Sequence, residues 1–466
     1  MGSLIPLYNK ISDVRDPKVS IVPVLDKWIE NGRAVDKDRL LVILKELRKY
    51  KRYNHALEIS VWMSDKRYYP LTCSDVAIRL DLIAKVHGIE QAEEYFNNVP
   101  RELKAPEAYN AFLNCYVHAG LVEKAEAVMQ QRNDLGFASS SLSYNVLVKL
   151  YYKIGNYEKM ETILHEMEKK GIGPDKITYG TQISAYVANS DVKRIEEILT
   201  RVETDPEALN WSIYSIAANG YIKAGLVDKA LLMLKKSEEQ ILSAEKKGMA
   251  FQCILTQYAK IGKKDEVLRL WEVYKNQQKV YNKGYGSVIT SLLKLDDIEG
   301  AEKVFEEWES KNLNYDTCVP NCLIAACCRK GLLEKAETLL NRVIEKGGKT
   351  DAMTWHFLAM GYLHHNQMQK AVEATKGEIT LALSWWRPTK NFAMCLGYLK
   401  GKGDLDGAEE IIRLAADKGF IAADTQERLL NYLKDGKSNS EVPLEMKETS
   451  DLLAAEENGL ESRNML

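Results

Sequence analysis

Apolar residues recur at helical spacing through residues 141–175, which read SLSYNVLVKLYYKIGNYEKMETILHEMEKKGIGPD. The i, i+3, i+4 intervals of this pattern are typical of a helix that buries one face. The apolar positions fall in two segments: Tyr144, Leu147, Val148, Tyr151 and Tyr152, then Met160, Ile163, Leu164 and Met167. Gly155 separates the segments, and Gly171 and Pro174 follow the second. We therefore predict two helices joined by a short turn.

A single helical pair of this length cannot bury both of its faces, so it requires neighbours of the same kind. Alignment on residues 141–175 divides residues 37–423 into eleven units of 34 to 37 residues. The units are 37–71, 72–105, 106–140, 141–175, 176–210, 211–247, 248–281, 282–316, 317–351, 352–388 and 389–423.

Three columns of this alignment support the repeat. The twentieth position is a small residue where two helices would approach closely: Ala56, Ala125, Ala230, Ala301, Ala336, Ala371 and Ala408. The fifteenth position suits the turn between the helices: Gly120, Gly155, Gly225, Gly262, Gly331 and Gly403. The eleventh position lies on one face of the first helix: Tyr116, Tyr151, Tyr186, Tyr221, Tyr258 and Tyr362.

The segments outside the repeats are expected to cap the array. Residues 1–36 carry one helical pattern over 18–36, and residues 424–434 carry another, so we predict a capping helix at each end. Residues 435–466 are polar and lack the pattern, which indicates a tail with at most a short helix near 452–457. The predicted fold is an all-α, right-handed α-solenoid superhelix of about eleven helix-turn-helix repeats.

Composition limits what the array can bind or do. The net charge of −2 gives no global attraction for nucleic acid, so any such binding needs a local positive surface. Eight cysteines without paired spacing indicate free thiols rather than disulfides. No apolar run reaches about 18 residues, so we expect no membrane span. The first 17 residues show neither a secretory signal nor a clear organellar presequence.

Candidate catalytic and metal-binding groups are few. Cys318, Cys322, Cys327 and Cys328 fall on one predicted helix without CxxC pairs or a nearby histidine, so core or surface thiols are favoured over a zinc site. His364 and His365 lie in a turn, and packing is favoured for Trp385 and Trp386. Residues after Ala423 contain no cysteine or histidine, which excludes a zinc deaminase there. We expect no enzymatic activity, no cofactor and no metal.

The unit ends and helix starts carry a recognisable motif. Tyr-Asn begins the first helix at Tyr109-Asn110 and Tyr144-Asn145, and a methionine lies in the second helix at Met63 and Met167. Residues 171–175 read GIGPD, and Thr178-Tyr179 opens the next unit. These residues resemble the pentatricopeptide repeat, in the pure 35-residue (P) class of plant organelles. A tetratricopeptide repeat would show a different pattern.

The resemblance implies that each repeat addresses one base of single-stranded RNA, in order from the 5′ end. In that family, the fifth residue and the last residue of a repeat read the base, and the second residues of successive repeats sandwich it. Asn145 with Asp175 and Asn321 with Asp351 resemble uracil-preferring pairs, and Asn110 with Ser140 resembles a cytosine-preferring pair. The implied sandwich residues are Leu142, Ile177, Met249, Cys318 and Met353. Glu107 is a poor sandwich residue beside Asn110.

Other units depart from this pattern at the fifth position, where they carry Gly180, Ser215, Gln252, Gly286, His356 and Ala393. A glycine or alanine offers no reading group, so those repeats would accept any base or none. The implied target is therefore a pyrimidine-containing strand of the form 5′-CU, four undefined bases, then U.

The thirteenth position is cationic in six units: Lys49, Lys153, Lys223, Lys260, Lys294 and Arg329. His118 and His364 occupy it in two more. Stacked repeats would place these residues in a stripe that could contact RNA phosphates. Alternatively, each cation only complements the dipole at the end of its own helix.

Two functions follow. The first is binding of single-stranded RNA in organellar processing, stabilisation, splicing or translation, in a mitochondrion rather than a chloroplast. The alternative is a helical scaffold that binds a protein partner with little sequence-specific RNA recognition. The net acidity and the six fifth-position departures favour this alternative. We expect a monomer in either case.

Overall fold

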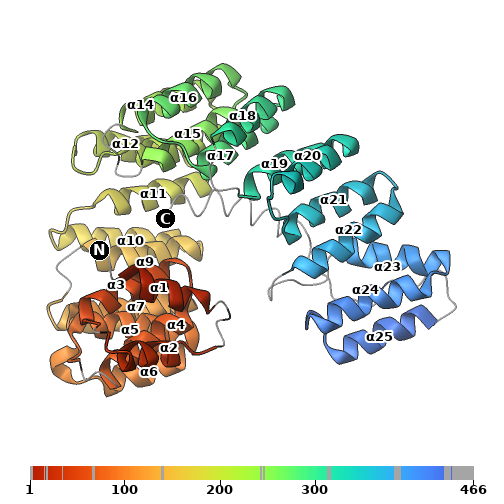
Figure 1. The fold of residues 1–466 in the computed structure, drawn as a ribbon. Helices are drawn as coiled ribbons and strands as arrows, with labels where there is room; N and C mark the ends of the chain where they lie inside the picture. The colour runs from red at the N-terminus through yellow and green to blue at the C-terminus, as the bar shows by residue number, and fades with distance from the viewer. Residues whose placement is uncertain are drawn as a thin grey trace. The chain divides into compact units, whose positions relative to one another are not determined.

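The computed structural model describes residues 4–434 and residue 442, apart from 15, 17–18, 34, 66–68, 138–140, 242–243, 245–246, 312–315 and 383–389. Within these residues the chain forms 25 α-helices and one short 3-10 helix, Arg101–Leu103, and no strand (Figure 1). The all-α prediction is confirmed. Residues 435–441 and 443–466, with the predicted short helix near 452–457, lie outside the described residues, as do Trp385 and Trp386.

The chain divides into two compact units, with residues of the α11–α12 pair in both. The first unit contains α1 (Leu4–Asp13), α2 (Val22–Glu30), α3 (Lys37–Lys49), α4 (Tyr53–Asp65), α5 (Cys73–Val86), α6 (Ile89–Asn98), α7 (Pro106–Ala119), α8 (Val122–Asp134), α9 (Ser141–Lys153) and α10 (Tyr157–Lys169). The divided pair is α11 (Lys176–Ala188) and α12 (Val192–Glu203).

The second unit contains α13 (Trp211–Lys223), α14 (Val227–Glu239), α15 (Lys247–Lys260), α16 (Lys264–Gln277), α17 (Asn282–Lys294), α18 (Ile298–Ser310), α19 (Cys318–Arg329), α20 (Leu333–Glu345), α21 (Ala352–His364), α22 (Met368–Leu381), α23 (Lys390–Lys402), α24 (Leu405–Asp417) and α25 (Ala423–Lys434). The predicted C-terminal capping helix is therefore present as α25.

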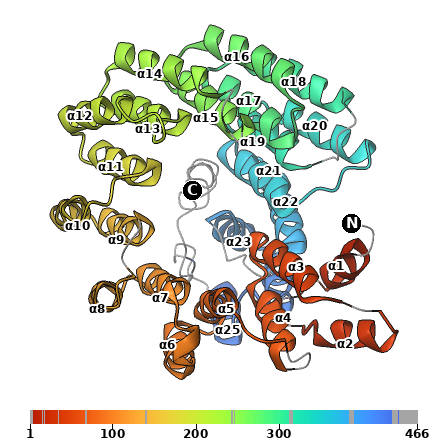
Figure 2. The ribbon, with the colours of Figure 1, turned by 90° about the vertical axis from the view of Figure 1, so that its left-hand side faces the viewer.

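Within each unit, first helices of successive pairs pack against one another. In the first unit α5, α7 and α9 lie side by side, and in the second unit α13, α15, α17, α19, α21 and α23 do so (Figure 2). We call these helices the first-helix row of each unit. This stacking lines up corresponding positions of successive repeats, and thus places the candidate binding residues.

The N-terminal segment contains more structure than the sequence predicted. The single helix expected over 18–36 is α2, which begins at Val22, and α1 precedes it without having been predicted. Leu7 and Ile11, one helical turn apart, are both buried in a cluster with Leu25 and Leu40. A ten-residue helix is unstable alone, so α1 owes its structure to this burial.

The turn between the two helices has a left-handed residue at the fifteenth position. Gly155 has φ of 72°, and the other five glycines of this column have φ between 72° and 77°. In four units that lack the glycine, the residue at this position has a left-handed backbone conformation as well. These residues are Lys51, Ser190, Asp296 and Asn366, with φ between 56° and 63°. The tertiary structure therefore imposes this conformation even where a side chain makes it unfavourable.

Gly155→Ala should destabilise the protein by about 1 kcal/mol, because an alanine pays the steric cost of the left-handed region. A Cβ at Gly155 would have no heavy atom within 4 Å outside its local backbone, so the cost comes from the backbone alone. Denaturant midpoints would measure it. Gly173→Ala is the matched control, because that glycine also faces open space but does not have a positive φ. Equal losses for the two variants would contradict the explanation.

The twentieth-position alanines lie where the sequence predicted them, in the helix contacts. All seven side chains are completely buried. A larger side chain at these positions would have to displace a neighbouring helix, which explains why a small residue recurs.

The eleventh-position tyrosines join successive pairs. Tyr151 on α9 donates a hydrogen bond to Glu126 on α8, and Lys159 Nζ lies 2.5 Å from the same carboxylate. Lys159 also lies 5.6 Å from the centre of the Tyr151 ring. The hydrogen bonds from Lys159 and Tyr151 hold the pKa of Glu126 below its ordinary value. Tyr362, Glu337 and Lys370 repeat the arrangement in the second unit, with hydrogen bonds of 2.7 Å.

Candidate nucleic-acid interface

Asn145 and Asp175 are in direct contact, although 30 residues separate them. Asn145 projects from the second turn of α9, and Asp175 precedes the first residue of α11. Asn145 Nδ2 lies 3.0 Å from each carboxylate oxygen of Asp175. Asn145 is only 5% exposed, whereas Asp175 is half-buried.

Asp175 is held as a carboxylate by its neighbours. Burial alone would raise its pKa, but hydrogen bonds from the Ser141 hydroxyl, the Thr178 backbone and the Asn145 amide outweigh burial and lower it. Ser141 Oγ lies 2.6 Å from Oδ2, and the Thr178 backbone N–H lies 2.9 Å from Oδ1. The ionised carboxylate can only accept hydrogen bonds, so the Asn145 amide must turn its nitrogen toward it.

Thr178 completes this arrangement from the following repeat. Its hydroxyl donates to Asn145 Oδ1 at 2.6 Å and accepts from the Asp175 backbone N–H at 3.1 Å. Thr178 is fully buried. The amide of Asn145 is thus contacted at both of its polar atoms.

The same arrangement recurs in the second unit. Asn321 Nδ2 donates to Asp351 at 3.1 Å, and Thr354 Oγ1 donates to Asn321 Oδ1 at 2.8 Å. Thr317 stands in the place of Ser141 and lies 2.8 Å from Asp351 Oδ2. Burial would raise the pKa of Asp351, but hydrogen bonds from Thr354, Thr317 and Asn321 lower it. Both pairs read from the sequence are therefore brought together.

The third pair is described only in part, because Ser140 lies outside the described residues. Asn110 Oδ1 accepts a hydrogen bond from Ser143 Oγ at 3.1 Å. Asn114 Nδ2 donates to the Asn110 backbone carbonyl at 2.9 Å.

Two large apolar side chains flank the Asn145–Asp175 pair along the chain. Leu142 and Ile177, the second residues of successive repeats, are each 52% exposed. Cys318 is exposed, whereas Met249 and Met353 are half-buried. Exposed apolar side chains of this size are candidates for contact with a flat ligand such as a base.

The remaining fifth-position residues differ in accessibility. Ser215 is 2% exposed and lies 3.0 Å from Gln257 Oε1. His356 is 4% exposed and lies 3.2 Å from the buried Glu378 carboxylate. The side chains of Gln257 and Glu378 therefore contact these two residues, which the sequence had placed among the departures from the reading pattern. The only sequence signal was polar residues at inward-facing positions of the adjacent helices, Gln257 and Glu378.

The thirteenth-position residues all lie in the last turn of a first helix and are exposed: Lys49, Lys153, Lys223, Lys260, Lys294 and Arg329, together with His118 and His364. Lys49 is paired with Glu46 at 3.3 Å. No salt bridge involves Lys153, Lys223, Lys294 or Arg329 among the described residues. The cations therefore have the exposure that phosphate contact needs, and they also lie where a helix dipole favours them.

A cluster of cations spans three helices of the first unit's first-helix row. His118 keeps an exposed edge, but partial desolvation of its ring lowers its pKa, and the charges of Lys85, Lys153 and Lys149 lower it further. Burial and the charge of Lys153 likewise lower the pKa of Lys149. Lys85 is already paired with Asp81 at 2.8 Å. Lys149 and Lys153 on α9 are therefore the charges of this cluster that remain available to an anion.

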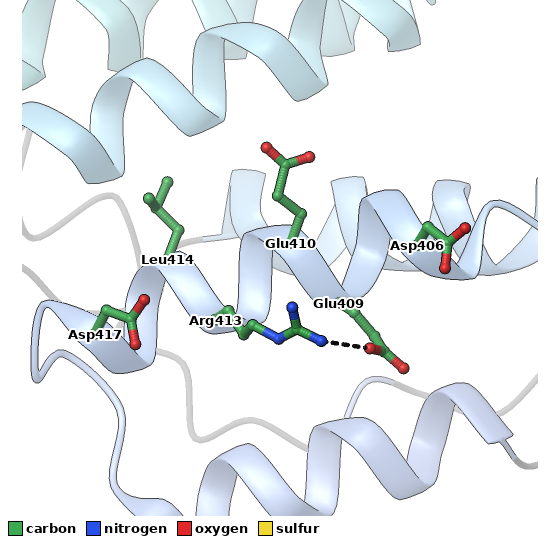
Figure 3. Close-up of a pocket in the computed structure, with 6 residues that line it drawn as sticks. All are labelled: Asp406, Glu409, Glu410, Arg413, Leu414 and Asp417. Carbon is green, nitrogen blue, oxygen red and sulfur yellow. Dashed lines mark hydrogen bonds and ion pairs between the residues drawn. The ribbon is translucent and has the colours of Figure 1, made fainter.

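The surface hollow on α24 does not suit an anionic ligand. Figure 3 shows its lining, which comes from one helix and includes four acidic side chains and one arginine: Asp406, Glu409, Glu410, Asp417 and Arg413, with Leu414. Arg413 is already paired with Glu409 at 3.2 Å. An RNA backbone would be repelled here.

Metal-binding clusters and membrane-spanning helices are absent from the part of the chain that the structure describes. It contains no cluster of three or more potential metal ligands and no helix long and apolar enough to cross a membrane. Cys327 and Cys328 are buried, and burial raises the pKa of Cys328 to about 12. The His365 ring packs against Gly331, and His364 Nδ1 lies 2.8 Å from the Met360 carbonyl oxygen.

Comparison with known sequences identifies the repeats. A model of the PPR repeat family matches residues 139–188, and a PPR repeat model matches residues 107–131, 212–240, 284–313 and 319–348. The Arabidopsis thaliana "Pentatricopeptide repeat-containing protein At2g20710, mitochondrial" is 44% identical over 90% of this chain and 86% of its own length. The Arabidopsis "Large ribosomal subunit protein mL101 (rPPR4)" is 40% identical over 93% of this chain and 89% of its own length.

Among solved structures, the maize pentatricopeptide repeat protein PPR10 is similar, with a TM-score of 0.51 and 16% identity. The match covers 89% of this chain, and this chain spans 62% of the length of the maize chain. At this identity the likeness concerns the fold alone, and it confirms the predicted helical-repeat solenoid. The sequence relatives and the repeat models together show that the chain belongs to the pentatricopeptide repeat family.

Proposed function

We propose that this protein binds single-stranded RNA along its first-helix rows, one base per repeat, with uracil preferred at units 141–175 and 317–351. The observation that carries the proposal is the recurrent Asn–Asp–Thr arrangement, present with matching distances at Asn145 and Asn321. The Asp and Thr partners hold a reading amide in one orientation before any ligand arrives, which lowers the entropic cost of recognition.

The amide retains the groups that a base would need. An asparagine side chain offers two N–H donors and two acceptor lone pairs. One N–H shared between the two Asp175 oxygens and one lone pair facing Thr178 account for the contacts of Asn145. One donor and one acceptor remain, which match the carbonyl and N3–H of uracil.

Leu142 and Ile177 supply the apolar contacts in this proposal. Their exposure leaves their surfaces available to the two faces of a base addressed by Asn145. Stacking on good platforms contributes roughly 1–3 kcal/mol per base, and aliphatic side chains belong at the lower end of that range. Met249, Cys318 and Met353 would act in the same way at other repeats.

The names of the relatives support a biological setting. Several are named as mitochondrial, including the one that is 44% identical, so we place this protein in a plant mitochondrion. We also assign it to the pure 35-residue class. As a monomeric binding protein it would act by occupying an organellar transcript, and so protect it, remodel it or recruit a processing factor.

Selection of the purified protein against a random single-stranded RNA pool tests the proposal. The wild type should enrich a motif of the form CU, four unspecified bases, then U. Asn145→Ala should relax only the first U, and Asn321→Ala only the second, because each variant removes one reading amide. A pool with no enrichment at low and moderate salt would contradict sequence-specific RNA binding.

A second candidate function is supported by the relative named as a large ribosomal subunit protein. In that case this chain would be a component of a mitochondrial ribosome, held by protein and structured RNA together. This candidate predicts that the tagged protein sediments with the large ribosomal subunit in a mitochondrial extract treated to degrade free RNA. Sedimentation as a free protein would contradict it.

A further inference from the structure

A buried hydroxyl from the following repeat donates to the carbonyl oxygen of every candidate reading asparagine. Ser143 lies 3.1 Å from Asn110 Oδ1, Thr178 lies 2.6 Å from Asn145 Oδ1, and Thr354 lies 2.8 Å from Asn321 Oδ1. Each hydroxyl occupies the third position of its own unit. Among the units that precede another unit, the seven whose fifth residue is not asparagine are followed at that place by Ser74, Ala108, Ile213, Ala250, Gly284, Val319 and Asn391. A hydroxyl thus follows all three asparagines and one of the seven other residues.

Helix capping alone does not explain these hydroxyls. Thr178 Oγ1 accepts from the Asp175 backbone N–H, and Thr354 Oγ1 lies 3.3 Å from the Asp351 N–H. Capping of this kind uses a lone pair of the hydroxyl and leaves its proton free. Two acceptors lie within reach of that proton. The amide oxygen of the previous repeat lies at 2.6 Å from Thr178 and 2.8 Å from Thr354, nearer than the capping carboxylate oxygen at 3.0 and 2.9 Å, and both threonines are at most 2% exposed.

The hydroxyl therefore restrains the end of the amide that the carboxylate does not contact. If the amide of Asn145 turned over, its oxygen would face the ionised Asp175, and its N–H₂ would face Thr178. The hydroxyl and the carboxylate together favour one order of donor and acceptor. Cytosine presents the opposite order to uracil, an acceptor at N3 beside an N4–H₂ donor. A restrained amide can therefore distinguish the two pyrimidines, whereas a mobile amide pairs with either.

We propose that Thr178 and Thr354 are positioning residues that set the choice of uracil over cytosine at Asn145 and Asn321. This inference rests on the proposed RNA-binding function. Neither threonine needs to touch the base, because each acts through the orientation of the amide.

The test compares affinities for three RNAs of one design, 5′-CUNNNNU, 5′-CCNNNNU and 5′-CUNNNNC, with common flanking sequence. Thr178→Val removes the hydroxyl at nearly constant volume. It should lower the U-over-C ratio at the second base about fivefold, the typical value of one neutral hydrogen bond. The ratio at the seventh base should not change. Thr354→Val should lower the U-over-C ratio at the seventh base by about the same factor and leave the ratio at the second base unchanged. Thr178→Ser, which keeps the hydroxyl, should retain the wild-type ratio at both bases.

The ratio is measured within one variant, so a loss of folded protein lowers both affinities and leaves it unchanged. Equal weakening for U and C in Thr178→Val and Thr354→Val would show that the threonines are only structural and would overturn the inference. In that case a wild-type U preference that is lost in Asn145→Ala would leave the proposed function standing. A wild type without U preference at either base would overturn both.

Discussion

Replacing Lys149 and Lys153 together with glutamate should weaken binding of single-stranded RNA on the order of a hundredfold, because two phosphate contacts become repulsive. Both lysines are exposed on α9 and have no salt-bridge partner among the described residues. They also lower the pKa of His118 on α7, so their charges act on the neighbouring helix of the same first-helix row. Lys85, the other lysine of the cluster, is already paired with Asp81, so Lys149 and Lys153 are the lysines of the cluster available to RNA.

The salt dependence gives a second readout of the same variant. Loss of two phosphate contacts should reduce the slope of log affinity against log salt by about 1.4, at roughly 0.7 per contact for a single strand. Fluorescence anisotropy with a labelled RNA at several salt concentrations would measure both quantities. Because the contacts are to phosphate, weakening should be uniform across RNA sequences.

The matched control is the double variant Lys169→Glu and Lys193→Glu. These lysines are exposed on the second helices α10 and α12, so the net charge changes equally while the first-helix row is untouched. Comparable losses in the two double variants would mean that RNA responds only to net charge. A wild-type affinity for Lys149→Glu/Lys153→Glu would favour the helix-dipole explanation of these cations.

Trp308→Ala should destabilise the protein by about 3–5 kcal/mol, the usual range for removing a large aromatic side chain from a core. Trp308 lies on α18, is 1% exposed and stacks on Phe305 at a centroid distance of 5.5 Å. Its indole N–H donates to Asn282 Oδ1 at 2.9 Å, at the start of the partner helix α17. The substitution removes both the packing and the link between the helices.

The loss should be local at first, because each repeat contacts only its neighbours. Hydrogen exchange should accelerate most in residues 282–310, and denaturant unfolding should show an earlier midpoint. Trp308→Phe, which keeps most of the volume but not the hydrogen bond, should lose about 1–2 kcal/mol. If Trp308→Ala and Trp308→Phe were equally destabilised, the hydrogen bond rather than the packing would dominate at this position.

Much of the fold was readable from the sequence because it is local and periodic. Helical spacing fixed the two helices of residues 141–175, and the buried alanines at Ala125 and Ala336 mark helix contacts that a small residue alone predicts. Helix α1 was missed, because Leu7 and Ile11 form too short a pattern until neighbouring helices bury them. The eleventh-position tyrosines were placed on the correct helix, but their hydrogen bonds to glutamates such as Glu126 were not foreseen.

The sequence by itself determined the repeat and its register, because corresponding positions of a stacked repeat fall at predictable places. The pairing of Asn145 with Asp175 was implied by the resemblance to the pentatricopeptide repeat. Only the tertiary structure decided how each reading position is surrounded. It buried Ser215 against Gln257, and it brought Thr178 onto Asn145 from 33 residues away. It also forced Lys51 and Ser190 into the left-handed turn that glycine occupies elsewhere. Side-chain packing between repeats sets these contacts, and a pattern along one chain segment does not contain that information.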